Sequence, residues 1–535
     1  MPVARTRAGN AGFMTSAWDP LERPLFRALW IATVVSNIGT WMHEVGAGWL
    51  MVTLDPRPIM VSLVQAATAL PIFFLALPAG ALADILDRRR YLIATQVWML
   101  AAAALLGMLT LAGLTTAWML LGFTFALGIG AAMMTPAWAA TLPELVPREE
   151  LQPAVTLNSI AINLSRAIGP AIAGVVVTAA GSGAAFVLNA LSFLGVIAVL
   201  ARWQRAPATS TLPAERFFGA MRAGLRYVRQ AGELQAVMLR ALAFFVFATA
   251  LWALLPLTAQ RIGGGAGVYG TLLACLGAGA VAGAMVLPPL RARISRDQLV
   301  RSGTTLFAGA MIGSALLDNV WFLGAAMLAG GAAWMATLSS FHVAAQMAVP
   351  AWVRARALAI YLVSFAAGTV GGAAVWGAVA GRAGVPFALI AAAGGALLAA
   401  AATWRVSLDQ AEPAGSDRRD WPDPQTHGTI DPDRGPVMVN VEYRIDPARA
   451  HAFTAAVSEL ERVRRRDGAT SWGLFSDAAD PGRYVEFFLV ESWAEHLRQH
   501  GRATVADREV TERVRGYHIG AEPPRVSHLI APGQD

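Results

Sequence analysis

Long uncharged stretches of apolar residues recur along this 535-residue chain, and they limit its fold more than any other feature. A helix needs about 20 such residues to cross the roughly 30 Å of hydrocarbon in a bilayer. With 56% hydrophobic and only 14% charged residues, the chain has too little polar surface for an ordinary soluble enzyme. We therefore expect an all-α membrane protein with about twelve transmembrane helices. These helices are expected to begin near Ala28, Ile59, Tyr91, Ala117, Pro153, Ala184, Ala236, Val268, Leu299, Val320, Arg356 and Val385.

Arginine residues are distributed unevenly over the loops between these stretches. Most of them fall in alternate loops, whereas the opposite loops contain only Arg57, Arg261 and Arg382. Basic residues favour the cytosolic side of a membrane, so we expect a multi-pass protein of the bacterial inner membrane with both termini in the cytosol. The same bias accounts for the net charge of +7. No nucleic-acid partner is needed to explain it.

An internal repeat divides the chain. The segment from Val146 aligns without gaps on the segment from Val349, so that Gly169 matches Gly372 and Gly174 matches Gly377. Transporters are often built from such repeated bundles, and we expect two six-helix bundles in the same orientation. The expected parts are an N-terminal cytosolic tail (1–27), an N-terminal bundle (28–203), a cytosolic connector (204–235), a C-terminal bundle (236–405), a flexible linker (406–436) and a cytosolic domain (437–535).

The connector contains an amphipathic helix. Its apolar residues recur at helical spacing, and Arg222, Arg226 and Arg229 lie on another face. Two arrangements fit this pattern. The helix either lies on the inner leaflet, attracted by anionic lipid, or packs against the bundle as a linker.

The segment after the linker alternates between strand and helix patterns. VMVNVEYRI, SWGLFSD, RYVEFFLVES and residues 525–530 read as strands. A helix capped by Asp446 follows the first strand, and a second helix is expected from Trp493 to Tyr517. The order βαββαβ predicts a small α+β domain of the ferredoxin-like kind.

The charged segment GALADILDRRR separates the second and third apolar stretches. Its spacing, Gly-x-x-x-Asp followed by Arg-Arg, resembles the loop between spans two and three in the major facilitator superfamily. The chain departs from the usual pattern at Ile85 and Asp87. The residues that carry the resemblance are Gly80, Asp84, Arg88 and Arg89. With the six-plus-six layout, it covers nearly all of residues 25 to 405 and implies the major facilitator fold.

A short loop of this kind ties two helices together, and its acidic residues can cap or pair with a helix start in the other half. Arg354 and Arg356, at the start of span eleven, are the candidate partners. The family resemblance implies that this cytosolic gate, to which Asp84, Asp87, Arg88 and Arg89 contribute, holds the outward-open state. In the alternative interpretation, the arginines only set the topology.

A second motif concerns the direction of transport. RAIGPAIAG, with Gly169, Pro170 and Gly174, resembles the span-five element of exporters, although Ala173 replaces one glycine. Small residues permit close approach of helices, and a proline deforms a helix. FVLNALSFL, TLPELVP and WAEHLRQHGRATVADREV together resemble the enterobactin-exporter-like branch of bacterial secretion effectors. The tail resembles the antibiotic-biosynthesis-monooxygenase type of dimeric barrel.

Polar residues in the middle of span one form the candidate coupling site. Asn37, Thr40, Trp41 and Glu44 follow the spacing i, i+3, i+4 and i+7 and share one helix face, which His43 flanks. Arg166 lies in the middle of span five. Charges inside a membrane are costly and often mark proton or substrate paths. We expect Glu44 to exchange a proton and Arg166 to tune the proton affinity of Glu44. Asn37, Trp41 and His43 are expected to contact substrate. Alternatively, the charges form a satisfied pair that only fixes packing.

These features predict a secondary exporter of a small amphipathic molecule, such as a siderophore, drug or secondary metabolite, driven by proton antiport. The sequence has no phosphate-binding loop and no lysine, which argues against an ATP-driven pump. No cofactor or metal is expected. The tail is either an oxygenase, with acid, base or ligand roles for His451, His496, His500 or His518, or a regulatory or dimerisation module, which we prefer.

We predict that Asp84→Asn impairs transport while leaving membrane insertion intact, because the arginines that set the topology remain and the gate loses a charge. Export rate should be measured at an expression level matched to the parent. Undiminished export at that level would contradict a gating role for Asp84.

Overall fold

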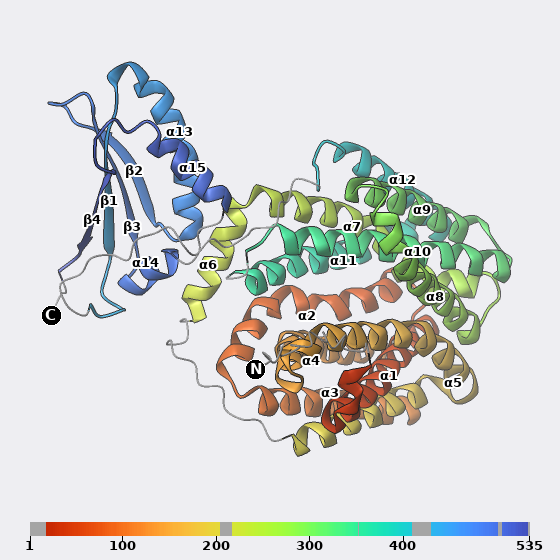
Figure 1. Ribbon diagram of the computed structural model, residues 1–535. Helices are drawn as coiled ribbons and strands as arrows, with labels where there is room; N and C mark the ends of the chain where they lie inside the picture. Colours follow the sequence, from red (N-terminus) through yellow and green to blue (C-terminus); the bar gives the residue numbers. More distant parts are fainter. Residues whose placement is uncertain (1–17, 204–216, 351–352, 409–429, 501–504, 533–535) are drawn as a thin grey trace, which may run out of the picture.

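The computed structural model describes residues 18–203, 217–350, 353–408, 430–500 and 505–532, which form a large helical bundle and a small α+β domain (Figure 1). The N-terminal half contains α1 (Pro24–Leu54), α2 (Pro58–Ile85), α3 (Arg88–Leu111), α4 (Ala117–Leu145) and α5 (Leu151–Arg202), with short 3-10 turns at Asp19–Glu22 and Arg148–Glu150. The C-terminal half contains α7 (Gly232–Arg261), α8 (Ala266–Arg291), α9 (Arg296–Leu316), α10 (Val320–Met347), α11 (Arg354–Ala383) and α12 (Val385–Ala402). Between the halves lies α6 (Phe217–Gln230).

Within the described residues, nine helices are long and apolar enough to cross a membrane, which confirms a multi-pass helical membrane protein. Helices α1 and α9 are not among these nine. Polar residues such as Asn37 and Glu44 lower the hydropathy of α1, and α9 begins with charged residues. The long α5 is interrupted at Gly181, whose φ of 75° and ψ of 169° are not helical. Twelve crossings remain a prediction.

Glycines let the helices of each half approach closely. In the C-terminal half, a Cβ atom on Gly279 would overlap the backbone of Leu328, and one on Gly331 would overlap the backbone of Leu276, so α8 and α10 pack backbone to backbone. In the N-terminal half, Gly128 of α4 sits against α2 in the same way. In a bilayer, where water provides no driving force between helices, such close packing holds a bundle together.

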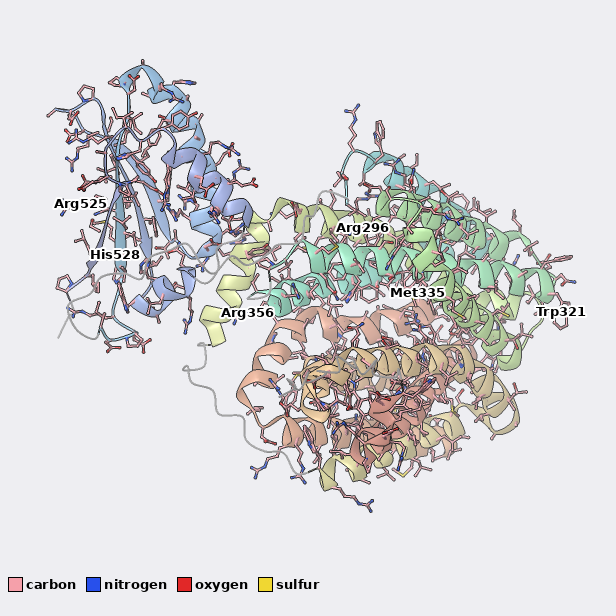
Figure 2. All side chains as sticks on the ribbon, viewed as in Figure 1. Arg296, Trp321, Met335, Arg356, Arg525 and His528 are labelled. Carbon is pink, nitrogen blue, oxygen red and sulfur yellow. The ribbon has the colours of Figure 1, made fainter. Side chains whose placement is uncertain are left out.

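The bundle has two ends, which we call the connector end and the far end. The connector end carries α6 and the α+β domain, and the far end carries the α1–α2 and α7–α8 turns (Figure 1). Arg356 lies at the connector end and Trp321 lies at the far end (Figure 2). Helix α6 contacts α7, α11 and α13, so it packs between the bundle and the α+β domain. This arrangement agrees with the second of the two predicted for the connector.

The α+β domain is a four-stranded antiparallel sheet with the order β2-β3-β1-β4. Its elements are β1 (Val437–Arg444), a 3-10 turn (Pro447–Arg449), α13 (Ala450–Asp467), β2 (Ser471–Ser476), β3 (Arg483–Val490), α14 (Trp493–His500), α15 (Val505–Arg515) and β4 (Arg525–Ile530). The register pairs Val439 with Phe488 and Trp472 with Phe488. The single helix expected from Trp493 to Tyr517 is instead two helices, separated by residues 501–504, which lie outside the described residues.

Helices α13 and α15 cover the sheet face that is turned toward the bundle (Figure 1). Phe453, Val457 and Leu460 of α13 pack with Val441 and Tyr443 of β1 in the core. The opposite face carries Phe475, which is 61% exposed and stacks on Phe487 at 5.5 Å between ring centroids. The domain therefore has one covered face and one open apolar face.

A buried carboxylate organises the core of this domain. Glu486 is fully buried and accepts hydrogen bonds from Arg464 Nε at 3.0 Å, Trp472 Nε1 at 3.1 Å and Tyr443 Oη at 3.1 Å. Burial, together with the nearby carboxylate, raises the pKa of Tyr443. Buried charges are tolerated where hydrogen bonds satisfy them, as they do here.

Candidate functional site

The polar face of α1 is directed toward α5 and α8. Asn37, Trp41 and Glu44 are half-buried, and Thr40 is exposed, with its hydroxyl donating to the Ser36 carbonyl at 3.0 Å. A Cβ atom on Gly169 of α5 would lie 2.6 Å from Trp41 Cβ, so α1 and α5 touch at this level. About two turns further along α1 than Trp41, Gly48 faces the hydroxyl of Tyr269 in α8.

Arg166 meets this face from α5. Its guanidinium carbon lies 5.9 Å from the centre of the Trp41 ring. Glu44 interacts electrostatically with both Arg166 and Tyr269. Among the described residues, the Nε and Nη1 atoms of Arg166 are buried without a hydrogen-bond partner. The structure thus brings Glu44, Trp41 and Arg166 together, but not as the satisfied pair of the packing alternative.

His43 lies on another side of α1. It is 5% exposed, and its ring packs against Phe186 at 4.7 Å between centroids, inside the N-terminal half. Gly39 and Gly46 also face this second part of α5. The structure therefore separates His43 from Trp41 and Glu44, because residues 43 and 44 differ by about 100° around a helix. The sequence pattern places His43 beside the face shared by Trp41 and Glu44, whereas in this conformation His43 points away from that face.

The predicted exporter motif joins the two halves. A Cβ atom on Gly174 would lie 3.3 Å from the backbone of Gly270 in α8, and one on Gly270 would lie 2.6 Å from the Pro170 carbonyl oxygen. Closer to the middle of the bundle, Gly277 packs against the backbone of Arg166. Helices α2 and α11 also meet, where Gly377 packs against Ser62. Gly174, Gly270 and Gly377 all lie toward the far end, so the halves are joined there.

The charged loop binds within the N-terminal half. Arg88 donates to Glu144 at 2.5 Å and to the Ala140 carbonyl at 3.2 Å, both in α4. Arg89 donates to the carbonyls of Leu200 and Ala201, at 2.8 and 2.6 Å. These bonds tie the α2–α3 loop to the ends of α4 and α5.

The charged loop has two acidic residues, Asp84 and Asp87. Asp87 caps α3 by accepting from the backbone N–H of Arg90 at 2.9 Å. Asp84 lies near the end of α2, but its side chain is outside the part of the chain that is described. Among the described residues, nothing lies within 4 Å of a Cβ atom built at Gly80.

The expected partners in the other half lie at the start of α11. Arg354 is exposed, and Arg356 packs against Gly224 of α6. The gate between Asp84 and these arginines stays a prediction.

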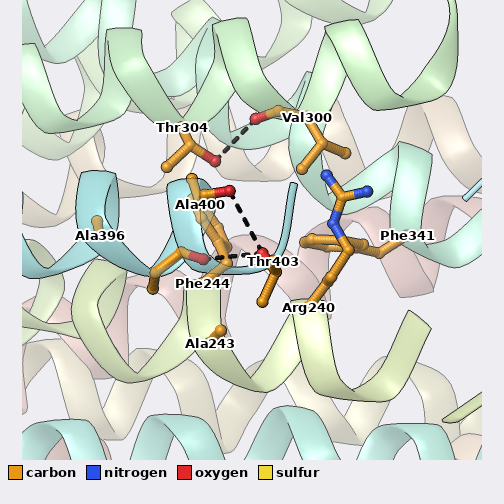
Figure 3. Close-up of a pocket in the computed structure, with 10 residues that line it drawn as sticks. Arg240, Ala243, Phe244, Val300, Thr304, Phe341, Ala396, Ala400 and Thr403 are labelled. Carbon is orange, nitrogen blue, oxygen red and sulfur yellow. Dashed lines mark hydrogen bonds between the residues drawn. The ribbon is translucent and has the colours of Figure 1, made fainter. Parts of the chain in front are cut away.

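A cavity lies inside the C-terminal half, between α7, α9, α10 and α12 (Figure 3). Its hydroxyls bond to their own helices: Thr304 donates to Val300 and Thr403 donates to Ala399. Arg240 at its edge is paired with Asp297. A rocking motion of one half against the other would not open a space within one half, so this cavity is a poor candidate for the transport path.

The candidate histidines of the α+β domain lie in different surroundings. His518 Nδ1 accepts from the Arg444 N–H at 2.9 Å, His451 is exposed, and the side chain of His500 is outside the described part. His496 is fully buried and its ring lies 4.7 Å from that of His528, whose pKa is lowered by burial. No group of three or more metal-binding side chains occurs among the described residues.

Sequence reasoning missed two residues that the fold places at the site and one that it places at the charged loop. Tyr269 is 4% exposed and reaches the α1 face from the other half. Asn163 lies three residues before Arg166 on α5, and its Oδ1 is buried without a partner in the described chain. Glu144 holds Arg88. The helical spacing to Arg166 could have identified Asn163, whereas Tyr269 required knowledge of how the halves pack.

A family described as "Transmembrane secretion effector" matches residues 15–534 of this chain. The chain is 26% identical over 281 residues to the staphyloferrin A transporter of Staphylococcus aureus. The aligned region covers 52% of this chain and 70% of the relative. It is 25% identical over 148 residues to macrolide efflux protein A of Streptococcus pyogenes, covering 28% of this chain and only 36% of that relative.

Solved structures show the same fold. A bacterial homologue of the human lysosomal transporter Spinster, in an inward-facing and unoccupied conformation, has a TM-score of 0.55 at 16% identity, covering 71% of this chain and 96% of that one. The nucleoside transporter NupG has a TM-score of 0.56 at 12% identity, covering 72% of this chain and 99% of that one.

We predict that Gly169→Leu and Pro170→Leu abolish or uncouple transport. Bulk at Gly169 would displace Trp41, and a straight helix at Pro170 would shift the contact with Gly270. Transport should be measured in vesicles with matched protein content. Gly122→Leu is the control, because nothing lies within 4 Å of a Cβ atom there. Tolerance of both α5 changes would mean that the motif has no part in transport.

Proposed function

We propose that this chain, which belongs to the transmembrane secretion effector family of major facilitator transporters, exports a small amphipathic molecule by proton antiport. The observation that carries the proposal is that Arg166 of α5 contacts the Trp41 ring of α1 inside the bundle and lies close enough to Glu44 to act on it electrostatically. An ionisable residue within a membrane is costly, and it is retained where it moves protons or binds substrate. Glu44 therefore exchanges the proton, and Arg166 tunes its affinity.

Alternating access would come from the glycine contacts between the halves. These contacts lie at the far end, at Gly174 with Gly270 and at Gly377 with Ser62. A site open toward the connector end and closed toward the far end follows from this arrangement. Because arginines dominate the connector-end loops, we assign that end to the cytosol and the chain to twelve crossings of the bacterial inner membrane.

The conformation described would then be inward-facing, which also bears on the gate. In that state, a gate that holds the outward-open form would be broken, and Arg356 would be available to pack against α6. The substrate class is an amphipathic metabolite, siderophore or drug. The relatives named for staphyloferrin A transport and macrolide efflux support this range, and the low identity to them leaves the choice open.

The α+β domain is proposed as a regulatory and dimerisation module with a ferredoxin-like fold, similar to the antibiotic-biosynthesis-monooxygenase type. The strand order β2-β3-β1-β4 with helices on one face supports this assignment. Its open sheet face carries Phe475, Phe487 and Leu529, turned away from the bundle, where a second copy would cover them. The mass of the full chain in detergent tests this dimer.

Contacts through α6 support a regulatory role. Arg226 of α6 donates to Glu495 of α14 at 3.2 Å, and Arg466 of α13 lies 5.9 Å from the Tyr227 ring centre. Tyr227, whose pKa is raised mainly by burial, donates its hydroxyl to the Ala348 carbonyl after α10 at 3.0 Å. Movement of the domain would therefore reach the loop before α11.

An enzymatic tail is the alternative, and the buried His496–His528 contact is the feature that favours it. Oxygen consumption on quinols that depends on His496 or His500 would support the enzyme. The same assay without turnover would favour the module.

We predict that Glu44→Gln abolishes coupling. The exported compound is first identified by comparing the media of the intact and the deletion strain, and its transport is then followed in proteoliposomes as substrate-driven proton flux. The variant's flux should fall to that of empty liposomes, because a glutamine cannot carry the proton. Glu459→Gln, on an exposed surface of the α+β domain, should behave like the parent. Parental coupling in Glu44→Gln would place the proton elsewhere.

We also predict that Arg226→Glu changes the transport rate and that adding Glu495→Arg restores it, because the double variant re-forms the ion pair with opposite polarity. The rate of export in vesicles, at equal protein content, is the measurement. If Arg226→Glu, Glu495→Arg and the double variant all transport at the parental rate, the contact does not regulate transport.

A further inference from the structure

Arg166 lies where a closed part of α5 meets an open part. Ser159, Asn163, Arg166, Pro170 and Gly174 follow one another at intervals of three or four residues and share a helix face. Toward the far end, the last two pack against α8, and the backbone of Arg166 touches Gly277. Toward the connector end, Ser159 is exposed. The guanidinium is thus the first charged group beyond the closed contact.

Two donor atoms of Arg166 are unused. Its Nε and Nη1 atoms are both buried and have no hydrogen-bond partner among the described residues. Glu44 acts on it only through space, and Trp41 covers it through its ring. A buried guanidinium without hydrogen bonds is unfavourable, and its planar fork fits the two oxygens of a carboxylate. This geometry is suited to a negatively charged ligand.

An unused acceptor accompanies these donors. Asn163 donates Nδ2 to the Ser159 carbonyl at 2.9 Å, which fixes the amide, while Oδ1 is buried with no partner in the described chain. Residues three apart on a helix are neighbours, so this oxygen lies on the same face as the guanidinium. A hydroxyl or amide N–H next to a carboxylate would satisfy it.

We propose that Arg166 and Asn163 recognise the exported substrate as an amphipathic carboxylate that carries a neighbouring hydroxyl or amide N–H. Arg166 binds the carboxylate, Asn163 Oδ1 accepts from the donor group, and the Trp41 ring contacts the apolar part. The inference rests on the proposed transport function, because it names the substrate class of the same site. It gives Arg166 direct contact with substrate in addition to its effect on Glu44.

The test uses three matched probes and the purified full-length chain in detergent, with binding measured by calorimetry. Mandelate has an aromatic ring, a carboxylate and an adjacent hydroxyl. Phenylacetate lacks the hydroxyl, and methyl mandelate lacks the charge. We expect mandelate to bind best, phenylacetate about fivefold more weakly and methyl mandelate at least about tenfold more weakly.

The variants assign these differences to residues. Arg166→Gln should weaken mandelate by about tenfold or more and remove its advantage over the methyl ester. Arg166→Lys keeps the charge but not the planar fork, so its affinity for mandelate should lie between those of the parent and of Arg166→Gln. Asn163→Ala should weaken mandelate and leave phenylacetate unchanged. Arg202→Gln, at the exposed end of α5, is the control and should bind like the parent.

Two results would overturn the proposal. One is a parent chain that binds methyl mandelate as well as mandelate, or that binds none of the three probes. The other is a folded Arg166→Gln variant, checked by its melting temperature, with parental mandelate affinity. If neither Arg166 variant folds, the ranking of the three probes on the parent still decides.

The Glu44→Gln variant separates this inference from the proposed antiport. Glutamine at position 44 removes a negative charge near Arg166, so recognition of a carboxylate by Arg166 predicts that Glu44→Gln binds mandelate at least as tightly as the parent. Proton exchange is tested separately by the substrate-driven proton flux of the same variant, and parental flux would contradict exchange at Glu44 while leaving carboxylate recognition by Arg166 in place. If the parent does not discriminate between the three probes, carboxylate recognition by Arg166 is contradicted, while the proposed proton antiport is unaffected.

Discussion

The close contact between α5 and α8 is the interaction on which the rest of the candidate site depends. Gly174 meets Gly270, and Gly277 meets the backbone of Arg166, so no side chain separates the two helices. In a bilayer, such contacts rely on van der Waals packing because lipid is as apolar as the side chains it replaces. The contact positions Arg166 against Trp41 and brings Tyr269 within reach of Glu44.

Two pairs of opposite charge inside the bundle differ in a way that separates structure from function. Asp297 of α9 pairs with Arg240 and also accepts from the Ser407 hydroxyl at 2.9 Å and the Leu408 N–H at 3.2 Å. These bonds hold the chain after α12 in place, and the pair is fully engaged. Arg166, by contrast, has two buried donor atoms, Nε and Nη1, without a partner among the described residues. Buried polar groups that the fold leaves unsatisfied are the ones available to a ligand or a proton.

The α+β domain is joined to the bundle through α6. Arg226 and Tyr227 occupy adjacent positions on this helix and contact different partners, the domain on one side and the end of α10 on the other. Arg466, held between Asp467 and Asp507, provides a rigid cation against the Tyr227 ring. A helix whose two faces are both occupied can transmit a displacement, which a freely solvated linker cannot.

The sequence by itself determined the membrane class, the division into halves and the α+β tail. Apolar length and arginine distribution are local properties, and the bilayer acts on them directly. The sequence also identified Glu44, Trp41 and Arg166, because charges and helical spacing are visible without a fold. Only the tertiary structure decided that His43 faces Phe186, that Arg88 binds Glu144 and that Tyr269 joins the site. These contacts depend on how each helix is rotated and on which helix lies opposite. Both are set by packing between residues far apart in the chain, about which local patterns carry no information.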